Sequence, residues 1–294
     1  MPSLKEVRIR IASIKSTQQI TSAMKMVAAS KLRRAQNAIL GLRPYATKLQ
    51  MMMGNLSASA GETASAVYTA ERTPNKVLLV LVSSNRGLCG GFNANVTKKA
   101  TELVHTKYAS QYAKGNVEIL AIGKKAMEFF QRRKFTIASS HNEIYDALSF
   151  DKVSAIADQI LKDFADKKYD VVEIVYNRFK NAAVQLLQVE QFLPLIPQQQ
   201  SAQKDTVQLD YIFEPSQEEI LDDLIPRSLK IQLYKAVLDS YASEHGARMT
   251  AMHKATDNAG DILRDLKLMY NKARQASITK EILEIVSGAE ALKG

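Results

Sequence analysis

The stretch that decides the fold lies near the N-terminus, where residues 4–42 read LKEVRIRIASIKSTQQITSAMKMVAASKLRRAQNAILGL. Positions alternately three and four residues apart form a heptad series in this stretch that continues for roughly five repeats. The series consists of Leu4, Val7, Ile11, Ile14, Gln18, Thr21, Lys25, Ala28, Leu32, Ala35, Ile39 and Leu42. This spacing predicts one long helix whose apolar stripe pairs with a second helix.

The heptad stripe contains a polar interval at Gln18, Thr21 and Lys25. Beside that interval a second apolar stripe appears at Ile20, Met24 and Val27. A helix with a single buried face needs only one stripe, so we expect this helix to meet two different partners along its length.

A second long helix is predicted after Pro226, because no proline follows it. Its heptad series is His245, Arg248, Met252, Ala255, Ala259, Ile262, Leu266, Met269, Ala273 and Ala276. Two striped helices at opposite ends of a chain can cover each other as an antiparallel coiled coil joined by a domain at one end.

The prolines suggest a register for this pair. If Pro44 and Pro226 mark the bases of the two helices, the numbers of facing residues add to about 272, since both helices rise equally per residue. That register sets Lys25 opposite Ala247 and Arg248, and Ile11 opposite Asp261 and Ile262. Residues from about 272 onward then extend as a single helix without a partner in this chain.

The middle of the chain changes period. Apolar runs predict strands at Lys76–Val82, Val117–Ile122, Val171–Tyr176 and Val184–Phe192, the last two joined as a hairpin at Asn181. Helical patterns at 95–108, 124–133 and 151–168 alternate with the strands, which predicts a Rossmann-like α/β domain with a mainly parallel sheet. We therefore expect coiled-coil helices at residues 1–57 and 215–294 and an α/β domain at residues 74–214, ending in a loop with a strand-like piece at Val207–Phe213.

The net charge of +10 is unevenly distributed. Residues 1–57 carry ten basic and one acidic side chain, whereas residues 227–294 carry eleven and eight. A basic helix can bind nucleic acid, an anionic membrane or an acidic protein, or can simply be solvated. The single cysteine, Cys89, excludes an internal disulfide. We expect no membrane span, because no apolar run reaches about 18 residues, and the opening MPSLKEVRIRI has no signal core or transit leader.

No catalytic, metal or cofactor site is predicted. The stretch 85–93, NRGLCGGFN, follows the first strand as a phosphate-binding loop would, but lacks the Lys-Ser/Thr of such a loop. It is more typical of a tight turn with positive φ, in which Cys89 is a packing thiol. The four histidines have no metal-ligand companions at usable spacing, and no nucleophile, base and orienting group are seen to converge.

Three blocks of sequence resemble one family. They are residues 11–36, residues 244–262 and residues 271–291 (NKARQASITKEILEIVSGAEA), and RGLCGGFN at 86–93 is a fourth agreement. These motifs are similar to the gamma subunits of F-type ATP synthases of the bacterial type, whose C-terminal signature matches at Ile278, Thr279, Glu281, Glu284, Gly288, Ala289 and Ala291. Asn85 stands where the family usually has Asp, and the paired-cysteine insertion of chloroplast members is missing.

The resemblance implies a non-catalytic rotary shaft that couples ion flow to ATP synthesis or hydrolysis on other chains. Its implied partners are the alpha and beta subunits of the catalytic hexamer, the epsilon subunit and the membrane c-ring, at the cytoplasmic face of a bacterial membrane. Contacts that couple rotation to catalysis are implied at Met24, Lys25, Arg248, Arg274, Gln275, Thr279 and Glu281. A foot that includes Leu209–Pro215 is implied to meet epsilon and the ring.

Two alternatives compete with this interpretation. A nucleic-acid-binding coiled coil would explain the basic helix, but the first 40 residues contain no aromatic side chain for base contacts. A nucleotide-binding enzyme built on the sheet would need a phosphate loop and a catalytic acid or base, and neither is found.

Overall fold

The computed structural model describes residues 3–59, 66–70, 72–195 and 216–291. The chain forms two compact units. The paired-helix unit combines residues up to Ala29 with those from Arg248 onward, and the sheet unit comprises Ser30–Ala247. Two long helices, α1 (Leu4–Ser59) and α7 (Gln217–Ala291), contribute to both units. The long terminal helices and the central α/β fold agree with the sequence prediction, and the strand-like piece at Val207–Phe213 lies outside the described residues.

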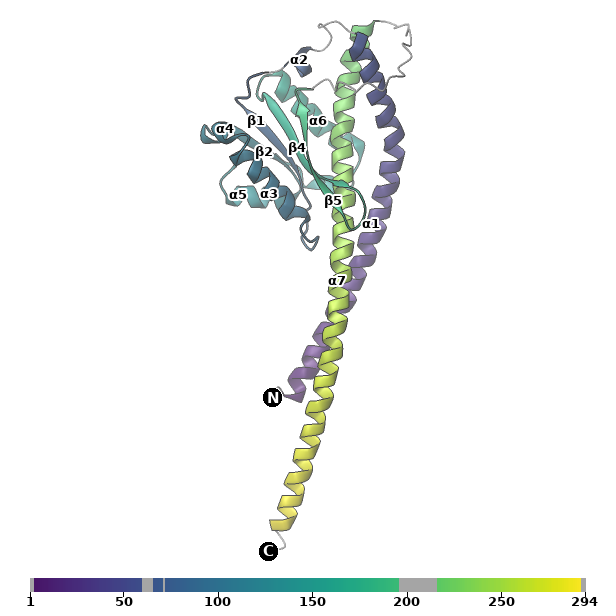
Figure 1. Ribbon diagram of the computed structural model, residues 1–294, viewed down its shortest axis with the longest axis vertical. Helices are drawn as coiled ribbons and strands as arrows, with labels where there is room; N and C mark the ends of the chain where they lie inside the picture. The colour runs from purple at the N-terminus through teal and green to yellow at the C-terminus, as the bar shows by residue number, and fades with distance from the viewer. Residues whose placement is uncertain (1–2, 60–65, 71, 196–215, 292–294) are drawn as a thin grey trace. The chain divides into compact units, whose positions relative to one another are not determined.

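The sheet has five strands in the order β3-β2-β1-β4-β5 (Figure 1). The strands are β1 (Val77–Val82), β2 (Val117–Ile122), β3 (Thr136–Ser140), β4 (Val171–Phe179) and β5 (Gln185–Leu193). Adjacent strands are parallel except β5, which runs antiparallel to β4. The mainly parallel sheet and the final hairpin are thus confirmed. Asn181 makes the hairpin turn, its side-chain oxygen accepting hydrogen bonds from the backbone N–H groups of Ala183 and Val184.

Strand β1 is buried along its whole length because helices cover both faces of the sheet. Its side chains alternate, with Leu79 and Leu81 under α3 (Phe92–His105) and α5 (Lys124–Arg132), and Val80 and Val82 on the other face. On that second face lie α6 (Phe150–Ala165) and the first third of α7 (Figure 1). The remaining short elements are α2 (Ala66–Thr69), α4 (Ala109–Ala113) and η1 (Glu143–Asp146).

The long helices do not end at their prolines, contrary to the expectation from sequence. Helix α1 continues through Pro44 to Ser59, and α7 begins at Gln217, before Pro226. An interior proline removes one hydrogen bond and costs roughly 3 kcal/mol. In α7 the buried side chains Leu221, Ile225 and Leu229 pack in the core of the sheet unit around that position. Tertiary packing therefore overrides the local signal that a proline gives.

Farther along α7, residues 236–247 are buried on nearly every side of the helix. Asp239 is only 7% exposed, and the described part of the chain gives its carboxylate no hydrogen bond or ion pair. Burial raises the pKa of Asp239 to about 6, and the more distant charges of Lys235 and Arg178 only partly oppose this effect. The folded chain consequently holds the proton on this carboxyl group up to a higher pH than the unfolded chain does.

We predict that Asp239→Asn stabilises the protein at pH 7.5. The pKa of Asp239 rises from 3.8 to about 6 on folding, so stability is lost as pH rises through this window. A neutral amide avoids that loss, and the gain in unfolding free energy at pH 7.5 should be on the order of 2 kcal/mol. Urea denaturation of the parent protein and of Asp239→Asn at pH 4 and pH 7.5 measures this gain. The gain should be smaller at pH 4, where the carboxyl group of the parent protein is protonated in the folded state.

The matched control is Asp223→Asn, because the side chain of Asp223 is 80% exposed. It should change the unfolding free energy by less than about 0.5 kcal/mol at either pH. A gain for Asp239→Asn that is equal at both pH values would contradict the assignment of the effect to ionisation.

Candidate functional site

The heptad stripe predicted on α1 is the covered face of that helix. All twelve predicted positions from Leu4 to Leu42 are buried or half-buried, and most positions between them are exposed. Within the paired-helix unit, Val7 and Ala28 are each 2% exposed. Of the second stripe, Ile20 and Val27 face away and are each 57% exposed, whereas Met24 between them is half-buried.

The covered stripe on α7 follows the predicted one as far as Ala259 and then departs from it at alternate positions. The predicted residues that are buried or half-buried are His245, Arg248, Met252, Ala255, Ala259, Leu266 and Ala273. Beyond Ala259, the other covered residues are Leu263, Tyr270 and Ser277, whereas Ile262 and Met269 are both 47% exposed. The sequence has an apolar side chain at both Ile262 and Leu263, so heptad spacing alone does not determine which of these two neighbours turns inward.

The register of the two helices is given by four contacts within the paired-helix unit. The side-chain oxygens of Thr21 and Thr256 lie 2.8 Å apart, Lys25 Nζ lies 3.5 Å from His253 Nδ1, and Arg8 donates a hydrogen bond of 3.0 Å to the hydroxyl of Tyr270. Gly260 faces the side-chain amide of Gln18. The residue numbers of each pair add to 277 or 278, so the expected sum of about 272 is wrong by one to two helical turns. The error follows from treating the prolines as helix ends.

The polar interval of α1 therefore meets a polar interval of α7. Thr21 also donates a hydrogen bond to the carbonyl of Gln18, and His253 Nδ1 lies 3.3 Å from Asp257 Oδ2 as well as near Lys25. Polar side chains in a coiled-coil seam stabilise it less than apolar ones but pair correctly in only one register. We infer that these contacts fix the alignment of the helices.

A disulfide test can distinguish the two registers. Cysteines at Thr21 and Thr256 should oxidise readily to a crosslink, because the two side-chain oxygens are 2.8 Å apart. Cysteines at Thr21 and Ala251, which the expected sum of 272 would pair, should remain free. The native Cys89 is buried and adds little background. Electrophoresis without reductant measures the crosslink, and linkage of the second pair instead of the first would refute the observed register.

The predicted contact residues fall into two groups. Met24 and Lys25 are half-buried on α1, and Arg248 is 8% exposed on α7. Arg274, Gln275, Thr279 and Glu281 are all exposed near the end of α7. Sequence reasoning missed His253, Thr256 and Asp257 beside Lys25, although their three- and four-residue spacing places them close together on one side of a helix.

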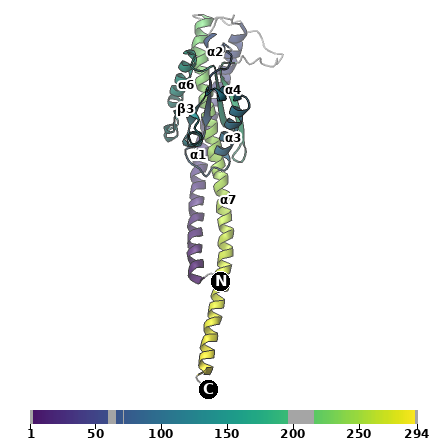
Figure 2. The ribbon, with the colours of Figure 1, turned by 90° about the vertical axis from the view of Figure 1, so that its left-hand side faces the viewer.

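Helix α7 continues beyond the N-terminal end of α1, as both views of the chain show (Figures 1 and 2). In this last segment Thr279 donates a hydrogen bond to the carbonyl of Gln275, and Ser277 to Glu281. Five large apolar side chains there are 47–71% exposed, namely Ile278, Ile282, Leu283, Ile285 and Val286. Nothing in the described chain covers this segment, in agreement with the expected single helix at the end of the chain.

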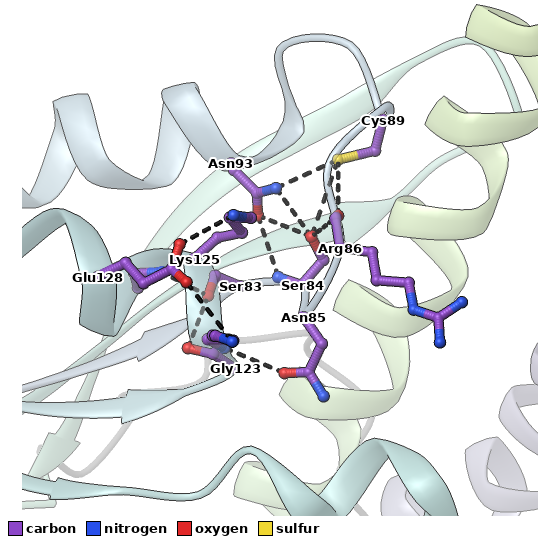
Figure 3. Close-up of polar contacts among 11 residues, drawn as sticks. Ser83, Ser84, Asn85, Arg86, Cys89, Asn93, Gly123, Lys125 and Glu128 are labelled. Atoms are coloured by element: carbon purple, nitrogen blue, oxygen red, sulfur yellow. Dashed lines mark hydrogen bonds and ion pairs between the residues drawn. The ribbon is translucent and has the colours of Figure 1, made fainter.

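The glycine-rich stretch after β1 is a turn closed on itself (Figure 3). Leu88 and Gly90 have φ of 62° and 59°, which confirms the expected turn with positive φ. Asn93 accepts a hydrogen bond from the backbone N–H of Ser84, and its amide donates to the sulfur of Cys89 at 3.2 Å. Cys89 is 2% exposed and packs against Phe92, so it is the expected packing thiol.

The neighbouring turn from β2 to α5 is also filled by the chain itself (Figure 3). The hydroxyl of Ser83 accepts a hydrogen bond from the N–H of Ala126, and Asn85 Oδ1 accepts one from the N–H of Lys124. Asn85 also donates to the carbonyl of Asn142 at 2.7 Å, a bond that the carboxylate of an aspartate could not make. The carboxyl edge of such a sheet is where related folds bind nucleotides. Here the first three N–H groups of α5 already donate to Asn85, Ser84 and Ser83.

Gly123 is required at this turn, and we predict that Gly123→Ala destabilises the protein by about 3 kcal/mol. Its φ is 104°, and an added Cβ would lie 2.1 Å from the carbonyl oxygen of Ser83. Thermal or urea unfolding measures the loss. Gly87→Ala is the control, because a Cβ there meets nothing within 4 Å. Equal stability of the two variants would show that the turn can relax.

No group of three or more potential metal ligands is found among the described residues. Likewise, none of the helices in residues 3–59, 66–70, 72–195 and 216–291 qualifies as a membrane-spanning segment.

Comparisons with known proteins agree along the whole chain. A sequence profile of the family described as ATP synthase matches residues 3–292. The chain is 55% identical over 294 residues to the ATP synthase gamma chain of Christiangramia forsetii, covering 100% of both. It is 46% identical over 293 residues to the gamma chain of Chlorobaculum tepidum, again covering 100% of both.

Solved structures are similar as well. A chain of the Tetrahymena thermophila mitochondrial ATP synthase, from a structure of its central stalk and c-ring, has 27% identity and a TM-score of 0.59, over 80% of this chain and 99% of that one. A chain of the Euglena gracilis mitochondrial enzyme has a TM-score of 0.68 at 22% identity, over 98% of this chain and 94% of that one, which supports the fold alone.

Proposed function

The chain belongs to the ATP synthase gamma-chain family, and on this premise we propose how its surfaces serve as the central rotary shaft of an F-type ATP synthase. The shaft transmits rotation of a membrane ring, driven by ion flow, to three catalytic sites on other subunits. The chain is itself non-catalytic. The observation that carries the proposal is the relationship of 55% identity along the full length, joined to an α7 segment whose apolar side chains have no cover in this chain.

The shaft acts by differential binding. A ligand shifts a conformational equilibrium only by as much as its binding energy differs between the conformers. An asymmetric shaft presents a different surface to each of three identical partners, and so favours a different conformation in each. The exposed stripe of Ile20 and Val27, on the side of α1 away from the seam, supplies one such surface.

We assign the coupling contacts to the two groups of residues described above. Met24 and Lys25 are proposed to meet an acidic loop of the catalytic subunits, and Arg248 on the facing helix α7 is proposed as a further coupling contact. Arg274, Gln275, Thr279 and Glu281 are proposed to form polar contacts with loops around the end of α7. The exposure of these four side chains leaves them available for such contacts.

The proposed partners are the alpha and beta subunits of the hexamer, the epsilon subunit and the membrane c-ring, with the complex at the cytoplasmic face of a bacterial membrane. The foot at Leu209–Pro215 lies outside the described residues. The division of the chain into coiled-coil helices at residues 1–57 and 215–294 and an α/β domain at residues 74–214 remains a prediction. A nucleotide-binding enzyme is disfavoured, because the described turns at the edge of the sheet are closed by their own hydrogen bonds.

The proposed coupling role of Lys25 can be tested in a complex reconstituted with the other subunits. Lys25→Glu should lower the ratio of ion pumping to ATP hydrolysis by severalfold while the complex still assembles. One exposed or half-exposed charge pair contributes only about 0–1 kcal/mol, which is too little to prevent assembly. Met24→Lys should perturb coupling too, by adding a charge beside the partner's carboxylates.

Lys48→Glu is the control, because Lys48 is an exposed residue of α1 outside the proposed contacts. It should leave coupling unchanged. Full coupling by Lys25→Glu would contradict the role of Lys25, whereas ATP hydrolysis by the purified chain alone would contradict the non-catalytic assignment.

A further inference from the structure

The two helical layers of the sheet unit carry opposite charge. Residues 92–134, which include α3 and α5, carry nine basic and three acidic side chains. Residues 143–168, which include α6 on the other face of the sheet, carry four basic and six acidic ones. The net charge of residues 58–226 is only −2, so the charge of this segment as a whole does not reveal its basic layer.

A groove runs between α3 and α5 on this basic layer. Two adjoining hollows of about 460 and 530 Å³ share Ala94, Thr97, Phe129 and Arg133 in their linings. Thr97, which is 5% exposed, and the half-buried Phe129 form its less polar floor. The groove is therefore a shallow depression that combines a threonine and a phenylalanine side chain with basic side chains around them.

Basic side chains of the groove are left over after pairing within the chain. Glu102 is paired with Lys99 at 2.6 Å and Glu128 with Lys125 at 2.8 Å, and Lys125 together with its neighbours lowers the pKa of Glu128. Among the described residues, Lys98 and Arg132 have no ion pair. Arg133 lies over the ring of Phe129, with its guanidinium carbon 3.6 Å from the ring centre.

We propose that the groove between α3 and α5 binds an acidic segment of a partner protein, with an apolar side chain set against the part of the Phe129 ring that Arg133 leaves uncovered and carboxylates beside Lys98, Arg132 and Arg133. This surface belongs to the sheet unit and is separate from the shaft contacts proposed on α1 and α7, so it goes beyond the rotary function.

The shape of the groove favours a protein segment over other anions. A flat anionic membrane would touch the exposed Lys98 and Arg132 with its headgroups but would set no apolar side chain against the half-buried Phe129. Single-stranded nucleic acid needs a free aromatic face for base stacking, and the face of Phe129 is covered by Arg133. A protein segment can supply both carboxylates and an apolar anchor.

The test uses the chain in the assembled complex. A photo-reactive benzophenone amino acid replaces Ala94, which is exposed and lines both hollows. We expect a crosslink to one subunit, mapped by mass spectrometry to a segment with at least two carboxylates. The double variant Lys98→Glu, Arg133→Glu should lower the crosslink yield at least about tenfold. Changing a mapped carboxylate residue of the partner to lysine should restore it.

Lys114→Glu is the matched control, since Lys114 is exposed in the same basic layer but outside the groove, and it should leave the yield unchanged. If the double variant does not fold, the milder pair Lys98→Gln, Arg132→Gln takes its place. The proposal is overturned by the absence of a crosslink, by a yield insensitive to the groove charges, or by a failure of the charge swap to restore it. It is also overturned if the chain instead binds phosphatidylglycerol vesicles and loses that binding in the double variant.

Discussion

The burial of helix α7 is the constraint on which the rest of the structure depends. Its first third supplies Leu221, Leu229 and Val237 to the core under the sheet, and its middle supplies Met252, Ala259 and Leu266 to the seam with α1. Neither α1 nor the sheet could cover its own apolar surface without these side chains, because an isolated amphipathic helix is marginal in water. A change in the phase of α7 would therefore disturb the sheet core and the helix seam together.

In the seam between α1 and α7, polar residues specify the register of the two helices, which apolar residues alone do not determine. Leucine, isoleucine and alanine pack acceptably in several alignments of two helices, so they stabilise the pair without selecting a register. The pairs of Thr21 with Thr256 and Lys25 with His253 meet in one alignment only. The interval that weakens the apolar stripe is thus the part that defines the geometry of the pair.

Much of the fold could be predicted from sequence, and the failures have physical causes. Strands β1 and β2 were recognised because continuous apolar runs mark strands buried on both faces, whereas the edge strand β3 reads TIASS and has no such run. The stripe of α1 was predicted completely. That of α7 was not, because apolar residues stand at both Ile262 and Leu263. Of the candidate sites, the closed turn at Cys89 was foreseen, but the groove between α3 and α5 was not, since net charge along the chain averages over two faces of one sheet.

The uncovered end of α7 has a consequence for the life of the chain before assembly. Ile278, Ile282, Leu283, Ile285 and Val286 form an apolar surface that the described chain leaves uncovered. A copy synthesised in excess of its partners would expose this segment to chaperones, to proteases and to other excess copies, with self-association rising with concentration. A cell that makes this chain therefore gains from balanced expression of all the subunits and from rapid removal of orphan copies.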